Sequence, residues 1–251
     1  MSKINKVAEI TVYFWIMKVF ATTLGETAGD FLSMTCNLGY WVGLAITMGF
    51  FILILMAQLI SKRFNSFIYW TVIVATTTVG TEISDLMDRT LGLGYMAGSL
   101  ILFLGLAATL AIWFYKERNL EVYPIYEKSQ EILYWVAILF SNSLGTALGD
   151  FLSDNLQLNY TGGAIVCAGI IFLVILLHYF SRINQVVLFW IAFIFTRPFG
   201  ATFGDLLTKP IAKGGLNIAR GEASLVTAFL LVSVLIYSSW KTKQKVAKLV
   251  P

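Results

Sequence analysis

The sequence predicts an all-α polytopic membrane protein, with eight transmembrane helices that form four parallel two-helix repeats in two similar halves. Three observations predict this class. The 251 residues are 58% hydrophobic and only 13% charged, whereas soluble domains have about 25% charged residues. Apolar stretches fill nearly all of the chain, and one motif recurs four times along it.

Eight apolar stretches follow one another, each with the roughly 20 residues that a helix needs to cross the hydrocarbon core of a bilayer. Little of the chain lies outside them, which leaves no room for a soluble domain. We expect the spans near residues 9–32, 39–60, 67–87, 94–115, 131–152, 161–180, 186–207 and 221–240.

The odd-numbered spans share the motif W-x9-G-x3-[GS]-D-x2-[STD]. A second spacing, of tyrosine and glycine, opens the first three even-numbered spans, and the fourth copy has Asn217 and Gly221 about three residues late, so each repeat is expected to be a two-helix hairpin. The tryptophan and aspartate of the motif stand, repeat by repeat, at Trp15 and Asp30, Trp70 and Asp85, Trp135 and Asp150, and Trp190 and Asp205.

The spacing of the repeats predicts an older duplication. Successive motif aspartates are 55, 65 and 55 residues apart, and copies one and three share the string GDFLS. We therefore expect two similar halves, residues 1–125 with the first two repeats and residues 126–251 with the last two.

The depth of the motif follows from the repeat. Because each repeat has two spans, all four odd-numbered helices run in the same direction, and their aspartates should lie at one depth near the outer ends. The tryptophans should lie about 22 Å away, at 1.5 Å per residue. There they would meet the inner membrane interface, where indole rings are favoured.

On the recurring tryptophan and the glycine–aspartate string, the chain resembles bacterial membrane proteins built from four tandem two-helix repeats of unknown function. The resemblance covers roughly residues 9–240. It implies a location in the bacterial cytoplasmic membrane. It implies no reaction, so the chemistry has to come from the residues themselves.

Small residues recur four apart in the same helices, as in the pairs Gly25 with Gly29 and Gly145 with Gly149. Such pairs let helix backbones approach closely in lipid, where the hydrophobic effect does not drive association. We expect the motif ends of the helices to pack closely together.

Acidic side chains fall within the odd-numbered spans, where a charged group costs about 3 kcal/mol and generally serves a function. Glu26 and Asp30 are four residues apart, and Glu82 and Asp85 three apart, so each pair shares a helix face. We predict that six residues form a metal-binding site: Asp30, Asp85, Asp150, Asp205, Glu26 and Glu82.

The charge balance supports a bound cation at this site. Only Arg197 and Lys18 are basic residues within these spans, and Lys18 is expected to extend to the inner interface. Two basic residues cannot balance six carboxylates, so we expect protonation or a bound cation.

The ligand chemistry favours a hard ion. Carboxylates with nearby threonine and serine hydroxyls suit a divalent ion such as Mn²⁺, Mg²⁺ or Ca²⁺. The single histidine, His178, lies near the inner end, and Cys36 and Cys167 match no metal-ligand spacing. No covalent cofactor is expected.

The basic residues outside the spans predict the orientation. Twelve lysines and arginines flank the side that holds both termini, against four on the other side, Arg89, Lys209, Lys213 and Arg220. Both termini are therefore expected in the cytoplasm, in a multi-pass protein of the bacterial inner membrane. The net charge of +4 comes from these flanking residues and indicates no nucleic-acid partner. The expected partners are lipid and a metal ion or proton, and homo-oligomerisation stays open.

We expect a cation transporter, with Mn²⁺ or a similar divalent metal as the first candidate and with proton coupling as an option. An enzyme is not expected, because the chain has no HExxH, no GxSxG and no nucleophile with an adjacent base. Three alternatives stay open: a structural or partner-binding membrane protein, a channel with the acids as a selectivity ring, and an enzyme with paired carboxylates.

Overall fold

The structure, a computed structural model, describes residues 5–156 and 158–247. Residues 1–4 of the first predicted half, and residues 157 and 248–251 of the second, lie outside the described part. The described residues form eight long α-helices and no strand, which confirms the all-α class. The helices are α1 (Val12–Asp30), α2 (Gly39–Ile60), α3 (Ser66–Asp85), α4 (Gly94–Glu117), α5 (Lys128–Asp150), α6 (Asn159–Phe180), α7 (Gln185–Thr208) and α8 (Arg220–Ala247).

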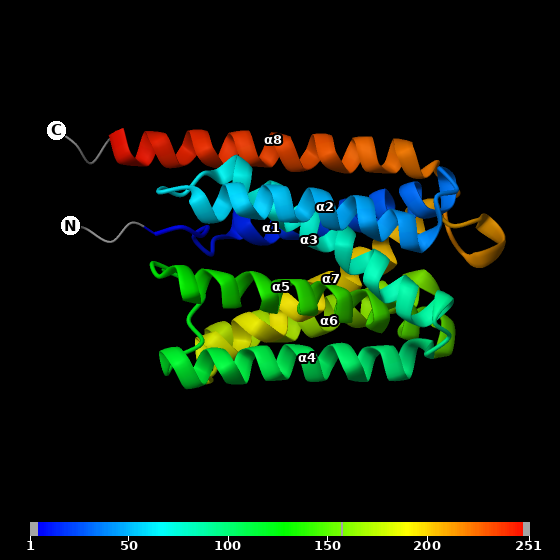
Figure 1. Cartoon of the computed structure of the whole chain (residues 1–251), viewed down its shortest axis with the longest axis horizontal. Helices are drawn as coiled ribbons and strands as arrows, with labels where there is room; N and C mark the ends of the chain where they lie inside the picture. Colours follow the sequence, from blue (N-terminus) through cyan, green and yellow to red (C-terminus); the bar gives the residue numbers. More distant parts are fainter. Residues whose placement is uncertain (1–4, 157, 248–251) are drawn as a thin grey trace.

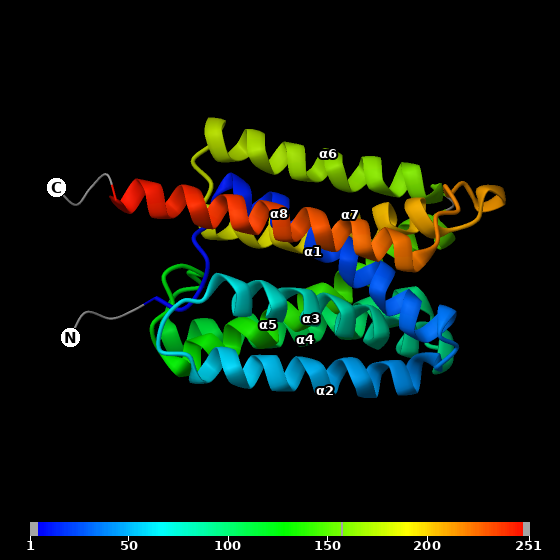
Figure 2. The same cartoon turned by 90° about the horizontal axis from the view of Figure 1, so that it is seen from above.

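The four odd-numbered helices form a closed ring at the centre of the bundle. Helix α1 packs on α3, α3 on α5, α5 on α7, and α7 on α1. Helices α1 and α5 are therefore opposite each other in the ring, as are α3 and α7. The even-numbered helices lie around this ring (Figures 1 and 2).

The outer helices interlock the repeats. Each even-numbered helix packs on the odd-numbered helix of the following repeat: α2 on α3, α4 on α5, α6 on α7, and α8 on α1. The sequence predicted separate two-helix hairpins, and this detail was wrong. A helix that packs on the next repeat closes the ring, so no repeat buries its apolar surface alone.

The motif glycines set the spacing of the ring. A Cβ atom added to Gly25 would lie 2.9 Å from the backbone carbonyl carbon of Thr77, and one added to Gly80 would lie 3.0 Å from that of Asn142. The same approach joins Gly200 to Thr22. Each glycine thus receives the equivalent residue of the next repeat, which is the close backbone approach that small residues permit.

Six helices, α2 and α4 to α8, are long and apolar enough to cross a membrane by length and composition. The outer ones expose large apolar side chains, such as Leu53 and Phe229. These features support a multi-pass membrane protein. Helices α1 and α3 are not among these six, and both bury many polar side chains.

All four ring helices point the same way. Helix α1 begins and α8 ends at one end of the bundle, and the odd-numbered helices end at the other (Figure 1). After Asp30, Asp85 and Asp150 the helices continue as one π-helical turn each, over Phe31–Thr35, Leu86–Thr90 and Phe151–Asn155.

Three of the four motif tryptophans are buried in the core, where the sequence predicted rings exposed at the membrane interface, and Trp15 is partly buried. Trp70, Trp135 and Trp190 are at most 5% exposed. They pack with neighbouring aromatic rings such as Tyr69 and Tyr134. The reason is the closed ring, in which the first turns of the odd-numbered helices face one another instead of lipid.

Candidate functional site

The fold brings the four motif aspartates to one end of the ring. Asp30, Asp85 and Asp150 end α1, α3 and α5, and Asp205 lies in the last turn of α7; each residue is at most 4% exposed. Four buried carboxylates at helix C-termini would be costly without positive partners, because both the helix dipole and their mutual repulsion disfavour them. The structure supplies those partners from the chain itself.

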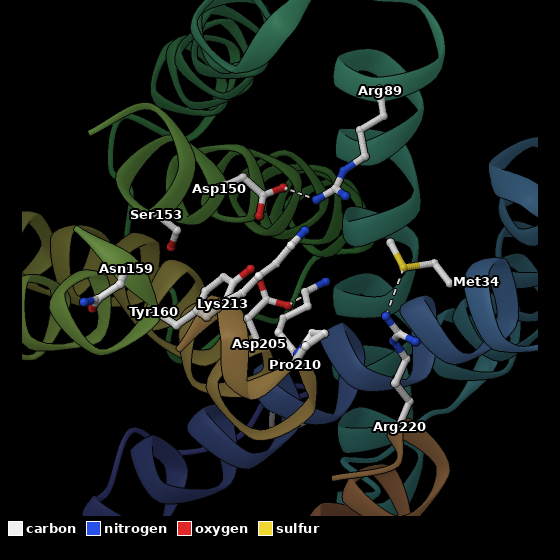
Figure 3. Close-up of a pocket in the computed structure, with 11 residues that line it drawn as sticks. Met34, Arg89, Asp150, Ser153, Asn159, Tyr160, Asp205, Pro210, Lys213 and Arg220 are labelled. Atoms are coloured by element: carbon white, nitrogen blue, oxygen red, sulfur yellow. Dashed lines mark hydrogen bonds and ion pairs between the residues drawn. The ribbon is translucent and has the colours of Figure 1, made fainter. Parts of the chain in front are cut away.

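Arg89 joins the aspartates of the second and third repeats. Its Nε lies 3.0 Å from Asp85 Oδ1, and its Nη2 lies 3.2 Å from Asp150 Oδ2 (Figure 3). Arg89 stands four residues after Asp85, so the two side chains meet one turn apart on the same helix face.

Lys209 joins the aspartates of the fourth and first repeats in the same way. Its Nζ lies 3.0 Å from Asp205 Oδ1 and 2.9 Å from Asp30 Oδ2. Arg220, at the start of α8, adds a contact of 3.3 Å from its Nε to Asp30 Oδ2. We call the four aspartates with Arg89 and Lys209 the aspartate ring.

Lys209 lies just beyond α7 and is strongly held by its neighbours. Burial alone lowers the pKa of Lys209, but the carboxylates of Asp205 and Asp30 outweigh this effect. The pKa is therefore raised above its usual value, and Lys209 remains an ammonium in this site.

A cavity of about 780 Å³ opens onto the aspartate ring. Asp150 and Asp205, which no single basic residue joins, both face it (Figure 3). Ser153 also lines the cavity, and its buried Oγ has no hydrogen-bond partner among the described residues. The other charged residues of its lining are Arg89, Lys209, Lys213 and Arg220.

Glu26 lies one turn deeper than the aspartates and has its own partner. Its Oε2 is 3.0 Å from Nη2 of Arg197, which also donates to Thr81 Oγ1 at 2.6 Å. Arg197 is fully buried, and Glu26 is 4% exposed. This ion pair belongs to the interior of the ring and not to the cavity.

Glu82 is separate from the aspartate ring. Its carboxylate lies between α2 and α3, in a space left by Gly43, and Ser33 Oγ is 2.6 Å from its Oε2. No basic side chain forms an ion pair with Glu82 among the described residues. The structure thus brings the four aspartates together, places Glu26 beneath them, and sets Glu82 apart.

The expected shortage of positive charge was wrong. The sequence assigned Arg89, Lys209 and Arg220 to the outer connections, but all three fold back onto the aspartates. The predicted position of the Lys18 side chain was also wrong. The side chain does not extend to the interface, because it is fully buried and its Nζ donates to Asn142 Oδ1 at 2.8 Å.

The carboxylates are occupied by these basic residues in this conformation. Among the side chains that the structure describes, no group of three or more Asp, Glu, His or Cys residues is placed to hold a metal ion. A metal would therefore have to replace Arg89 or Lys209 in order to gain several carboxylate ligands.

One signal in the sequence could have identified the bridging residues. Arg89 and Lys209 are 120 residues apart and occupy the same position, four residues after the aspartate, in repeats two and four. The cavity residues Asn159 and Tyr160 belong to the pattern that opens the even-numbered spans, but that pattern does not indicate a position beside the aspartates.

A family model described as a Repeat of Unknown Function (DUF347) matches the chain four times, over residues 13–64, 68–119, 133–184 and 188–244. These matches confirm the four tandem repeats. Neither the comparison with curated proteins nor that with solved structures gives a match.

Proposed function

The chain belongs to the family of proteins built from this repeat (DUF347), and from that premise we propose that it is a membrane transporter of a cation. The substrate would bind at the aspartate ring. A divalent ion of the hard class, with Mn²⁺ as the first candidate, fits its carboxylate and hydroxyl oxygens. The proposal assigns the chain no catalytic role.

The sharing of four buried aspartates by two tethered basic residues carries this proposal. Arg89 and Lys209 each form ion pairs with two carboxylates. A transported cation would take the place of one of them, so the tethered side chains act as competitors that occupy the site between substrates.

The pairing of the predicted acidic residues supports a cationic substrate. Five of the six, all but Glu82, pair with basic residues, namely Arg89, Arg197, Lys209 and Arg220. A cation that displaces one of these basic residues meets carboxylates that are already held in place. At about 30 Å³ per water molecule, the cavity of about 780 Å³ has room for an ion with its water shell.

We further propose that all eight helices cross the bacterial inner membrane. The outer helices meet lipid and shield α1 and α3, whose polar residues face the ring. Both termini would lie in the cytoplasm, because the connections at their end of the bundle hold most of the basic residues. The aspartate ring then opens to the outside, and an ion or proton gradient would drive transport.

Mn²⁺ uptake into proteoliposomes tests the proposal. We expect Asp30→Asn and Asp150→Asn each to lower uptake at least tenfold, because each removes a ligand from one bridged pair. Glu121→Gln, an exposed residue in the connection between α4 and α5, is the matched control and should transport normally. Unchanged uptake in both aspartate variants would end the proposal.

One observation favours a second candidate, a structural role. Each of the four aspartates already has a basic partner, as expected of an ion-pair network that holds the helix ends together. This structural role predicts that Asp30→Asn lowers stability and that proteoliposomes with the wild type show no more ion flux than empty liposomes.

A further inference from the structure

Two buried basic side chains cross the interior of the ring below the aspartates. Lys18 extends from α1 to the opposite helix α5, where its Nζ donates to Asn142 Oδ1 at 2.8 Å. The same Nζ lies 3.9 Å from the centre of the Phe193 ring on α7. Lys18 is fully buried, so its side chain lies inside the ring.

Arg197 crosses along the other diagonal. It starts on α7 and reaches the opposite helix α3, where it donates to Thr81 Oγ1 at 2.6 Å and lies 3.4 Å from the Thr77 carbonyl oxygen. It also pairs with Glu26 of α1. Lys18 and Arg197 together contact all four ring helices, which side chains can do only across the central axis.

The two residues lie about one helical turn apart. Lys18 follows its motif tryptophan by three residues and Arg197 follows its own by seven, a difference of about 6 Å along parallel helices. Glu26 is the carboxylate that pairs with Arg197, and Lys18 has no ion-pair partner among the described residues. At this depth the ring therefore holds two basic side chains and one carboxylate.

The charge interrupts a line of buried polar groups. Above it are the aspartates and Glu26. At the depth of Arg197 itself, Asn142 donates to Thr76 Oγ1 at 3.0 Å, and the hydroxyls of Tyr69 and Tyr134, which bind each other, lie below Lys18. Such a line could pass protons from one end of the ring to the other. A fixed positive charge on a narrow polar path repels protons and other cations.

We propose that, in this conformation, Lys18 and Arg197 form an internal cation barrier that closes the central axis of the ring to protons and metal ions. The aspartate ring is then the site of a carrier and not the filter of an open channel. The inference rests on the proposed function in one respect: it takes the aspartate ring as the entrance of a transport path. The guanidinium of Arg197 keeps its charge at any pH that the protein meets, so the barrier does not depend on pH.

Proton entry into proteoliposomes tests the barrier without any transported substrate. A potassium diffusion potential drives protons inward, and a trapped pH-sensitive dye reports them. The main variant combines Arg197→Thr with Glu26→Gln, which removes the ion pair as a whole and restores the threonine that repeats one and two have at Thr22 and Thr77. We expect at least tenfold faster proton entry than in the wild type.

Two variants control for the charge. Arg197→Lys keeps a positive charge on the axis, so its proteoliposomes should admit protons as slowly as those of the wild type. Arg182→Thr removes an exposed arginine and should also remain tight. If the double variant elutes and melts as a folded protein but admits protons no faster than the wild type, the proposal is overturned. Leakage of Arg197→Lys equal to that of the double variant overturns it as well.

Lys18→Met keeps the test decisive if the double variant does not fold. It leaves the pair of Arg197 and Glu26 intact, and we expect proton entry to rise several-fold, whereas no rise overturns the proposal. Failure of the transport function and failure of the barrier give different results. Absence of Mn²⁺ uptake with a leaky double variant contradicts the transport function alone, and normal uptake with a tight double variant contradicts the barrier alone.

Discussion

Arg89 of the second repeat binds Asp150 of the third repeat, with 3.2 Å between its Nη2 and Oδ2. Its counterpart 120 residues later, Lys209, binds Asp30 of the first repeat. The bridges therefore run between the second and third repeats and between the fourth and first. This alternation makes the site twofold, although the ring of helices has four similar members.

Removal of one bridging residue should destabilise the protein. In Lys209→Met, Asp205 loses its partner and Asp30 retains only Arg220. Loss of one member of a buried ion pair costs about 3–5 kcal/mol, so the unfolding temperature should fall clearly. Lys213→Met is the matched control, because Lys213 lines the same cavity but is exposed. Equal melting of Lys209→Met and the wild type would contradict the role of the bridge.

The contribution of Lys209 should persist at alkaline pH. Its pKa is raised in the folded protein by Asp205 and Asp30 against the effect of burial. A raised pKa stabilises fully below the unfolded value of about 10.4, and the effect declines only as the pH rises toward the folded value. The difference in unfolding temperature between the wild type and Lys209→Met should stay constant from pH 7 to pH 9. An increase over that range would show that burial lowers the folded pKa instead.

The contact between Gly25 and α3 should tolerate no side chain. In Gly25→Ala the new Cβ would lie 2.9 Å from the Thr77 backbone, and overpacking of this kind costs about 1–3 kcal/mol. Gly49→Ala is the control, because a Cβ there meets no atom within 4 Å. Thermal unfolding in detergent should separate the two variants, and similar melting would show that α1 and α3 can move apart freely.

The native cysteines can report the orientation. Cys36 is exposed at the aspartate end of the bundle, whereas Cys167 is buried in α6. A membrane-impermeant maleimide should therefore label intact cells at Cys36, and Cys36→Ser should abolish the label. Labelling of Cys36 only after the membrane is permeabilised would place the aspartate ring in the cytoplasm and reverse the proposed orientation.

Much of the fold follows from periodic features of the sequence. The eight helices, the four repeats and the common end of the aspartates were predicted because apolar length and motif spacing are local properties. The interlocking of the repeats was not predicted, because the sequence of one repeat does not determine that α2 packs on α3 of the next repeat. The burial of Trp70 and Trp135 follows from the same closure and was missed with it.

The site could be predicted in part. The four aspartates were identified because carboxylates within apolar spans are conspicuous. Their partners were missed because Arg89 and Lys209 stand just beyond the spans, where basic residues usually flank a membrane. The position of Glu82 apart from the ring depends on which face of α3 meets α2, and the spacing of Glu82 and Asp85 alone does not determine that.

Mn²⁺ binding to the purified protein, measured from the electron paramagnetic resonance signal of the free ion, tests the central claim most directly. If Lys209 is a tethered competitor for the ring carboxylates, Lys209→Met should bind Mn²⁺ at least tenfold more tightly than the wild type. Adding Asp30→Asn and Asp205→Asn to that variant should abolish the gain. Equal or weaker binding by Lys209→Met, or a gain that survives the loss of both carboxylates, would contradict the exchange of bridging residues for a transported cation.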